Sequence, residues 1–393
     1  MNFQVANRVG NSMRNVYINK IAAFLPNEAV DNTNIEKVLG QVGDRPSRAK
    51  RIILRSNKIE TRYYAIDPKT RKATHTNAEL TANAIKKLEA DGLDLDSVDL
   101  LSCGTTMPDQ LMPNHASMVH GELACNPLEV MSTAGICLSG ITALKYAYTA
   151  VKSGEAELAI ATGSENSSAV MRAENFTPEI EAKVDNLEKH PEIAFEKDFL
   201  RWMLSDGAGA IALSAKPNAD SLSLKIDKIF STSYANILEA CMYAGCEKQE
   251  DGSIRGWRTY APKEWLSKSI FAVKQDVKLL NENVMEYTVA KALTTMLEKN
   301  MFDPKEIDWF LPHYSSGFFR DGVYEKMKKA GCDIPQDKWF TNLPYKGNTG
   351  SASIYIMIEE LFNNAKIKKG EKILCYIPES GRFSTAFMLL EAV

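Results

Sequence analysis

The sequence lacks the patterns that mark a metal centre, a disulfide framework or a membrane protein. Its seven cysteines are odd in number and form no CxxC pair, and its five histidines show no HExxH or HxH spacing. No apolar run reaches the length of a membrane span, and the first residues show no basic region followed by an apolar core. We therefore expect a reduced, cytoplasmic protein without a metal ion and without a membrane span.

A strong charge of either sign is also missing. The formal net charge is −3, with 25% charged and 45% hydrophobic residues, which is typical of a soluble globular protein and gives no electrostatic footprint for nucleic acid. The chain has 393 residues, too many for one small core, so two or three domain-sized units are expected.

The second half of the chain repeats the first. A helix, a loop with an acidic residue and a buried strand follow one another in residues 84–106 and again in residues 292–315. A second helix–strand pair, one after Cys137 and one after Gly350, recurs at a similar offset of roughly 210 residues. This offset is too long for a solenoid repeat and predicts two similar α/β halves, each with a sheet and helices on its faces.

We place the halves at residues 1–220 and 221–393. Two polar stretches interrupt them: residues 165–200, interpreted as a cap over the first half, and residues 241–275. The glycine pair in Asp206–Gly209 is interpreted as a site of tight backbone packing, because no phosphate-binding motif follows it.

The most informative single stretch runs from Met131 to Gly140, where an apolar run meets a turn of small residues before a strong helix. Cys137 lies at that turn. Because the first N–H groups of a helix have no intrahelical partner and carry partial positive charge, we expect a favoured thiolate and a candidate nucleophile. The alternative is a buried cysteine that acts as a small hydrophobic residue.

Two further polar side chains lie at related positions in the second half. His313 directly follows a predicted strand, at the carboxyl end where α/β sheets usually collect their chemistry, and Asn348 lies in the turn that corresponds to the Cys137 turn. Taken singly, they would be a structural histidine and a turn asparagine. Pseudo-twofold packing of the halves predicts that the thiol, the imidazole and the carboxamide converge.

These residues resemble the thiolase superfamily and, within it, the β-ketoacyl-acyl-carrier-protein synthase III branch. The resemblance spans nearly the whole chain and rests on the motifs Phe24–Pro26, Cys137–Gly140, Ser205–Gly209, Trp309–His313, Gly347–Ser353 and Pro378–Phe383. It implies a thiolase-like α/β fold with duplicated halves in a five-layered αβαβα arrangement, and a homodimer.

The resemblance also implies a chemistry. Cys137 would accept an acyl group from coenzyme A or an acyl carrier protein, and His313 and Asn348 would stabilise the enolate of a malonyl- or β-ketoacyl-type thioester during a Claisen condensation. Backbone N–H groups of Cys137 and Gly381 would form the oxyanion hole. No cofactor is implied beyond these thioester substrates.

Departures from the family pattern indicate a specialised enzyme. Met112 replaces an aromatic residue that lines the partner's acyl pocket across the dimer, which favours a longer or bulkier acyl chain. Only Gly381 remains of a Gly-Gly-Gly loop, and the residues that clamp coenzyme A have no match near Arg51–Ser56. We expect a role in lipid-like or polyketide-like biosynthesis, such as that of alkylresorcinols or cyclohexanediones.

Other interpretations stay open: a housekeeping initiation synthase of fatty-acid synthesis, an acyltransferase to an alcohol or amine, or a non-catalytic partner subunit. The basic stretch from Arg45 to Arg62, including Arg48 and Arg51, is either solvated surface or a docking patch for an acidic carrier protein. Acyl chain length, the extender, the mode of delivery and cyclisation of the product are not fixed by the sequence.

Overall fold

The computed structural model describes residues 13–42, 50–176, 200–364 and 366–393. Nine strands form one mixed sheet in the order β13-β14-β15-β8-β1-β7-β6-β4-β5. The first half supplies β1 (Tyr17–Phe24), β4 (Leu100–Thr105), β5 (Glu129–Ala134), β6 (Leu158–Glu165) and β7 (Gly207–Ser214). The second half supplies β8 (Leu224–Ser233), β13 (Trp309–Pro312), β14 (Lys372–Glu379) and β15 (Ser384–Ala392).

The strand order is symmetric about its centre. Reading outward, β1-β7-β6-β4-β5 matches β8-β15-β14-β13, and the bridge from Phe310 to Trp339 occupies the place of β5 in the second half. The two sides join through a short β1–β8 pairing. The predicted internal repeat is therefore confirmed, and the proposed boundary at residue 220 falls between β7 and β8.

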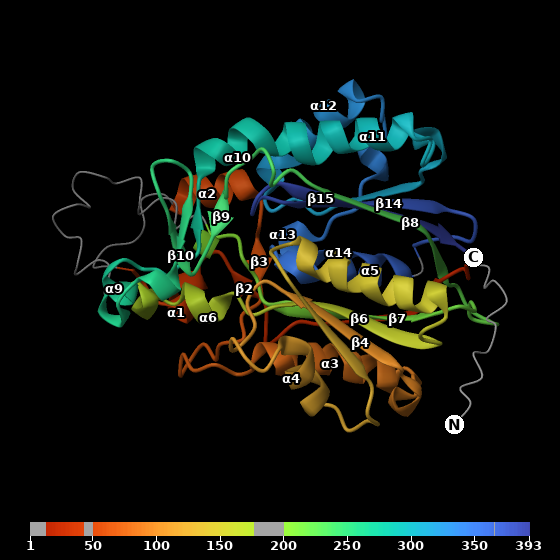
Figure 1. The fold of residues 1–393 in the computed structure, drawn as a ribbon, viewed down its shortest axis with the longest axis horizontal. Helices are drawn as coiled ribbons and strands as arrows, with labels where there is room; N and C mark the ends of the chain where they lie inside the picture. Colours follow the sequence, from red (N-terminus) through yellow and green to blue (C-terminus); the bar gives the residue numbers. More distant parts are fainter. Residues whose placement is uncertain (1–12, 43–49, 177–199, 365) are drawn as a thin grey trace, which may run out of the picture.

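Helices separate and cover the two parts of the sheet, giving the predicted αβαβα layers (Figure 1). The middle layer holds α5 (Leu138–Ser153) and α14 (Ser353–Asn363). The outer layers hold α3 (Asn77–Ala90) and α4 (His115–Gly121) on one side, and α10 (Val277–Val284), the π-helical η4 (Met285–Lys291), α11 (Ala292–Glu298) and α12 (Arg320–Lys329) on the other. In α14 the run from Ser353 to Ile358 is continuously buried, because this part of the helix is covered on all sides.

Glycines let α14 and the turn before it lie close to the first-half strands of the sheet. A Cβ at Gly209 would lie 2.3 Å from the Cβ of Tyr355, and one at Gly163 would lie 2.3 Å from the carbonyl oxygen of Ser351. Any side chain at these positions would push α14 off the sheet. The interpretation of the Asp206–Gly209 glycines as a site of tight packing is confirmed.

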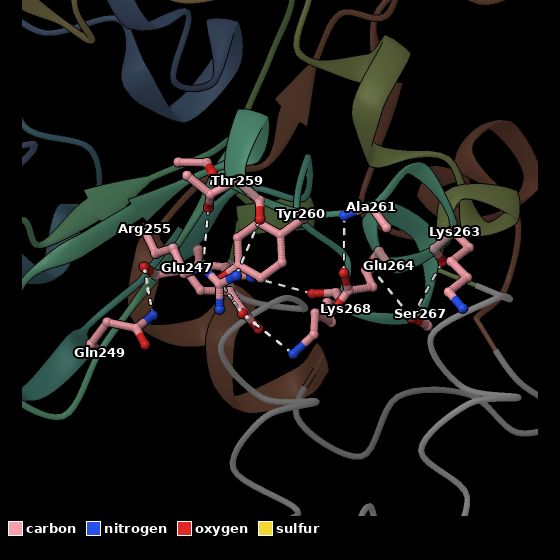
Figure 2. A network of polar contacts seen from close by, with 12 residues as sticks. Glu247, Gln249, Arg255, Thr259, Tyr260, Ala261, Lys263, Glu264, Ser267 and Lys268 are labelled. Carbon is pink, nitrogen blue, oxygen red and sulfur yellow. Dashed lines mark hydrogen bonds and ion pairs between the residues drawn. The ribbon is translucent and has the colours of Figure 1, made fainter.

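The second polar stretch folds into a small unit of its own. It contains β9 (Met242–Tyr243), β10 (Cys246–Lys248), β11 (Ile254–Gly256), α9 (Pro262–Ser267) and β12 (Lys274–Gln275). Glu247 accepts a 2.7 Å hydrogen bond from the Tyr260 hydroxyl and pairs with Lys268 at 3.6 Å (Figure 2). These contacts tie α9 to the β10–β11 hairpin.

Of the other polar stretch, α6 (Ser168–Met171) and the 3-10 turn η2 (Ala173–Asn175) are described. The predicted cap lies largely outside the described residues, which resume at Leu200. Within the described ranges, no helix has the length and apolar character needed to cross a membrane.

Candidate active site

Cys137, His313 and Asn348 line a single pocket. Cys137 caps the amino end of α5, His313 follows β13, and Asn348 lies in the turn before α14. The structure thus brings together three side chains that are far apart in sequence, as pseudo-twofold packing of the halves predicts.

The environment of Cys137 differs from the expected one. Burial and the nearby carboxylates of Glu379 and Glu165 raise the pKa of this thiol well above its usual value. The N–H groups of Ile136 and Leu138 donate to Glu379 Oε2 at 2.8 and 3.0 Å. The carboxylate of Glu379 therefore already occupies the amino end of α5 and offsets the positive end of the helix dipole there. The expectation that the thiolate of Cys137 is favoured is wrong.

Replacing Glu379 with glutamine is therefore expected to lower the pKa of Cys137, because one of the two nearby negative charges is removed. The rate of alkylation by iodoacetamide, followed by intact mass across pH, should rise at lower pH than in the wild type. An unchanged profile would show that the charge of Glu379 does not reach the thiol. Glu359→Gln, a carboxylate on α14 that does not line the pocket, is the matched control.

His313 lies in a setting that keeps it neutral. Its backbone N–H donates to the Tyr376 carbonyl at 2.8 Å, which continues the β13–β14 pairing, while its ring makes no hydrogen bond to any described residue. Burial lowers the pKa of the imidazole to about 4. A neutral ring presents one N–H donor and no charge to the pocket at neutral pH.

The carboxamide of Asn348 has a fixed orientation. Its Oδ1 accepts a hydrogen bond from the Gly350 N–H at 3.0 Å, and its Nδ2 donates to no described residue. The backbone of Asn348 is held by the Met203 carbonyl at 3.0 Å and the Ser205 N–H at 2.8 Å. The amide N–H₂ group is therefore left available to a ligand in the pocket.

Glu165 is a fourth polar group in the same pocket, and the sequence analysis did not single it out. Its Oε1 accepts hydrogen bonds from the backbone N–H of Thr106 at 3.2 Å and of Ser351 at 3.1 Å, and from the Thr106 hydroxyl. Burial raises the pKa of this carboxyl to about 7. Its position at the carboxyl end of the buried strand β6 was the available signal, the same one that identified His313.

The rest of the pocket is mostly apolar. Most of its apolar walls come from the segment after the cap, from β9 and the residue before β12 in the second polar stretch, and from α10, η4, η6 (Gly317–Phe319) and α12. They comprise Leu200, Met203, Leu204, Met242, Val273, Leu280, Val284, Met285, Phe319 and Val323. A hydrocarbon chain fits such walls.

The remaining predicted site residues lie around this pocket or outside it. The Gly381 carbonyl accepts from the Cys241 N–H at 2.8 Å, and a Cβ at Gly381 would lie 2.9 Å from Ile136 Cδ1, so this loop touches the residue before Cys137. Met112 is 82% exposed and does not line the pocket of its own chain. Arg51 is exposed on α2 (Lys50–Asn57), and Arg48 lies outside the described residues.

The described residues contain no group of three or more His, Cys, Asp or Glu side chains placed to hold a metal ion. Four polar groups of the pocket can take part in chemistry: the thiol of Cys137, the imidazole of His313, the carboxamide of Asn348 and the carboxyl group of Glu165. The other polar groups that line it include hydroxyl groups and the amide of Gln275. This set suits acyl transfer through a thioester.

Two family models match the chain in separate regions. The model "Thiolase, N-terminal domain" matches residues 62–201, and "3-Oxoacyl-[acyl-carrier-protein (ACP)] synthase III C terminal" matches residues 297–382. Among curated proteins, the β-ketoacyl-[acyl-carrier-protein] synthase III of Novosphingobium aromaticivorans is 25% identical over 366 residues, covering 92% of this chain and 94% of that protein. The enzyme of the same name from Anaplasma marginale is 24% identical and covers 90% and 92%.

Solved structures share the fold over nearly the whole chain. AbyA1, a tetronic acid condensing enzyme, superposes with a TM-score of 0.73 at 20% identity, covering 96% of this chain and 99% of its own. OleA of Xanthomonas campestris, solved with bound lauric acid and lauroyl-CoA, gives a TM-score of 0.70 at 19% identity, covering 97% and 100%. The chain has a thiolase-like fold and is a condensing acyltransferase similar to β-ketoacyl-acyl-carrier-protein synthase III.

Proposed function

We propose that the protein loads an acyl chain onto Cys137 and condenses it with a second thioester in specialised lipid or polyketide-like biosynthesis. A malonyl-type thioester would form its enolate by losing carbon dioxide, and a β-ketoacyl-type thioester would form it by losing an α-proton. The single observation that carries the proposal is the pocket itself. A thiol, a neutral imidazole and an oriented carboxamide line one apolar cavity.

Each polar group has a defined task. Cys137 forms the thioester with the first acyl group, with the backbone N–H groups of Cys137 and Gly381 as the proposed oxyanion hole. Two N–H donors, the ring of His313 and Nδ2 of Asn348, hydrogen-bond the carbonyl oxygen of the extender and stabilise its enolate. The carbanion then attacks the carbonyl carbon of the Cys137 thioester. The C–S bond breaks, and Cys137 leaves as a thiolate that takes a proton from solvent. The proposed steps use coenzyme A or carrier-protein thioesters as substrates and need no metal or redox cofactor.

The orientation of Asn348 favours condensation over simple acyl transfer to an alcohol or amine. Stabilising an enolate benefits from a second donor beside the histidine, whereas transfer to a hydroxyl does not need one. Because Gly350 holds Oδ1, the donating end of the carboxamide is the end left to the ligand.

The second polar stretch supports the proposal of a specialised substrate. Met242, Val273 and Gln275, which lie in it, form part of the pocket wall. A wall built from an added segment supports a substrate preference different from that of a housekeeping initiation synthase, and the apolar lining supports a medium or long acyl chain.

The test is intact-protein mass spectrometry after incubation with a panel of acyl thioesters on coenzyme A and on carrier protein. The wild type should gain the mass of one acyl group, and Cys137→Ala should gain none. Addition of malonyl thioester should then discharge the adduct and yield a β-keto product. An ester or amide product would replace condensation with acyl transfer, and no adduct with any donor would support the partner-subunit alternative.

Carrier docking at the basic surface is a separate proposal. α2, which carries Arg51, packs against η6 (Gly317–Phe319), and Phe319 of that turn lines the pocket. Arg51→Glu is expected to raise the KM for a carrier-bound donor several-fold and to leave the KM for the same acyl group on coenzyme A unchanged. Lys299→Glu, at the carboxyl end of α11, is the control. If Arg51→Glu changed the KM equally for both donors, Arg51 would have no specific role in carrier docking.

We also propose a homodimer with the Met112 region at its interface. Leu111 and Met112 are 74% and 82% exposed, and apolar side chains so exposed are commonly covered by a partner.

A further inference from the structure

Glu165 is a buried carboxyl group in the reaction pocket that none of the steps above uses. It lies with Cys137, His313 and Asn348 among the lining residues. We propose that Glu165 is a further catalytic residue: its Oε2 takes the proton from the Cys137 thiol during acylation and returns it to the departing thiolate. The inference rests on the proposed function and adds a proton acceptor to it.

The first argument is which oxygen is free. Three hydrogen bonds, from the backbone and hydroxyl of Thr106 and from the Ser351 N–H, all go to Oε1. The Ser351 hydroxyl also lowers the pKa of this carboxyl group, but it donates its hydrogen to the Ser164 carbonyl at 2.9 Å. None of these three hydrogen bonds ends on Oε2. An oxygen with unused lone pairs, on a side chain that lines the pocket, is suited to accept a proton.

The second argument is rigidity. A Cβ at Gly350 would lie 2.8 Å from Cγ of Glu165, so the carboxyl group packs directly against the turn that carries Asn348. Gly350 has a φ of +52°, in the left-handed region that glycine adopts without strain. The chain therefore holds this carboxyl group in one place beside the reacting groups.

The third argument is need. The thiol of Cys137 has a raised pKa because of burial and because of Glu379 and Glu165, so little thiolate forms unaided. The His313 ring is available as a donor to the extender, and its lowered pKa makes it a poor base. A carboxyl group with a pKa of about 7 accepts and releases a proton readily near neutral pH.

The step balances. The Sγ–H bond of Cys137 breaks as its proton passes to Oε2 of Glu165, and the Sγ–C bond to the acyl carbonyl forms. The C–S bond of the donor thioester breaks, and its thiolate leaves as a thiol after taking the proton back from Glu165. No oxidant or reductant is needed.

An equivalent residue in the other half provides an internal comparison. Glu165 ends β6, and Glu379 ends β14, the matching strand. Glu379 uses Oε2 to bind the N–H groups of Ile136 and Leu138 and does not line the pocket. Of the two equivalent carboxylates, only Glu165 offers an oxygen to the ligand space.

Other titratable groups around β6 face elsewhere or have assigned contacts. His115 of α4 hydrogen-bonds the Ser164 hydroxyl at 3.1 Å, and Cys103 is buried on β4. Cys137 and His313 line the pocket together with Glu165. The charge of Glu379, which does not line the pocket, raises the pKa of Cys137.

The experiment measures the single-turnover rate of Cys137 acylation by lauroyl-coenzyme A against pH, by rapid quench and intact mass. The wild-type rate should rise to a plateau with an inflection near pH 7. Glu165→Gln should be slower by about a hundredfold at neutral pH and should lose that inflection, rising steadily with pH instead. Glu379→Gln should keep the inflection.

Thr106→Val provides a second route if the glutamine variant does not fold. The Thr106 hydroxyl lowers the pKa of Glu165, so its loss should move the inflection to higher pH. Equal rates and profiles in the wild type, Glu165→Gln and Thr106→Val overturn the role of Glu165 while leaving the proposed function intact. If no thioester of the panel acylates the wild type, the proposed function itself fails.

Discussion

Replacing Asn348 with alanine is expected to slow condensation by about a hundredfold to a thousandfold while acylation of Cys137 continues at the wild-type rate. The reason is that Nδ2 of Asn348 is one of two donors left to the extender carbonyl, and the loss is felt only when the enolate forms. The measurement pairs adduct formation by intact mass with the release of β-keto product after addition of malonyl thioester.

Asn348→Asp distinguishes the role of the Asn348 side chain as a hydrogen-bond donor from its structural role in the turn. An aspartate can still accept the Gly350 N–H that Oδ1 holds at 3.0 Å, but it offers no N–H₂ group and adds a negative charge near the enolate. It should therefore condense no faster than the alanine variant. Thr349→Ala, one position along the turn and outside the pocket lining, controls for disturbance of the backbone. A parallel loss of acylation and condensation would assign Asn348 a structural role only.

Glu165→Gln is expected to change the pH dependence of stability in a defined direction. The pKa of Glu165 is raised from an ordinary 4.5 to about 7 in the folded state. A group whose folded pKa is raised contributes stability that is present below pH 4.5 and is lost as pH rises through 7. A shift of this size corresponds to roughly 3 kcal/mol. The glutamine variant has no carboxyl group at this position, so its free energy of unfolding does not fall in this way as pH rises.

The quantity to follow is the difference in free energy of unfolding between Glu165→Gln and the wild type, from urea titrations at several pH values. This difference should rise by roughly 3 kcal/mol in favour of the variant between pH 4.5 and pH 8. Asp206, His115 and His313 titrate in both proteins, so their contributions cancel in the difference. Glu89→Gln on the surface of α3 is the control, and a flat difference would show that Glu165 does not carry the proton.

The duplication and the convergence of three polar residues could be predicted from the sequence because both depend on local patterns. Helix, loop and strand recur in order, and chemistry collects at the carboxyl ends of strands, which places His313 and Asn348 near Cys137. The repeat also accounts for the symmetry of the strand order about its centre, but not for the order within each half.

The electrostatics of the site could not be predicted in the same way. Glu379 reaches the N–H of Ile136 from 243 positions along the chain, so nothing near Cys137 indicates the anion that raises its pKa. A glutamate at a strand end is expected to be a surface residue unless the helix that buries it is known. The turn at Gly350, which is distant in sequence, packs over Glu165 and helps to bury it.

The two strand-end glutamates also bear on how the halves depend on each other. Glu165 belongs to the first half and accepts from Ser351 at the start of the α14 turn, while Glu379 belongs to the second half and accepts from residues at the start of α5. Each glutamate therefore binds N–H groups at the amino end of the other half's central helix. A half cut free between β7 and β8 would keep a helix with an open amino end and a carboxylate with no helix to bind. In a twofold-symmetric dimer of half-length chains, one glutamate position would make both contacts, once from each copy. Joining the two copies end to end would keep this arrangement.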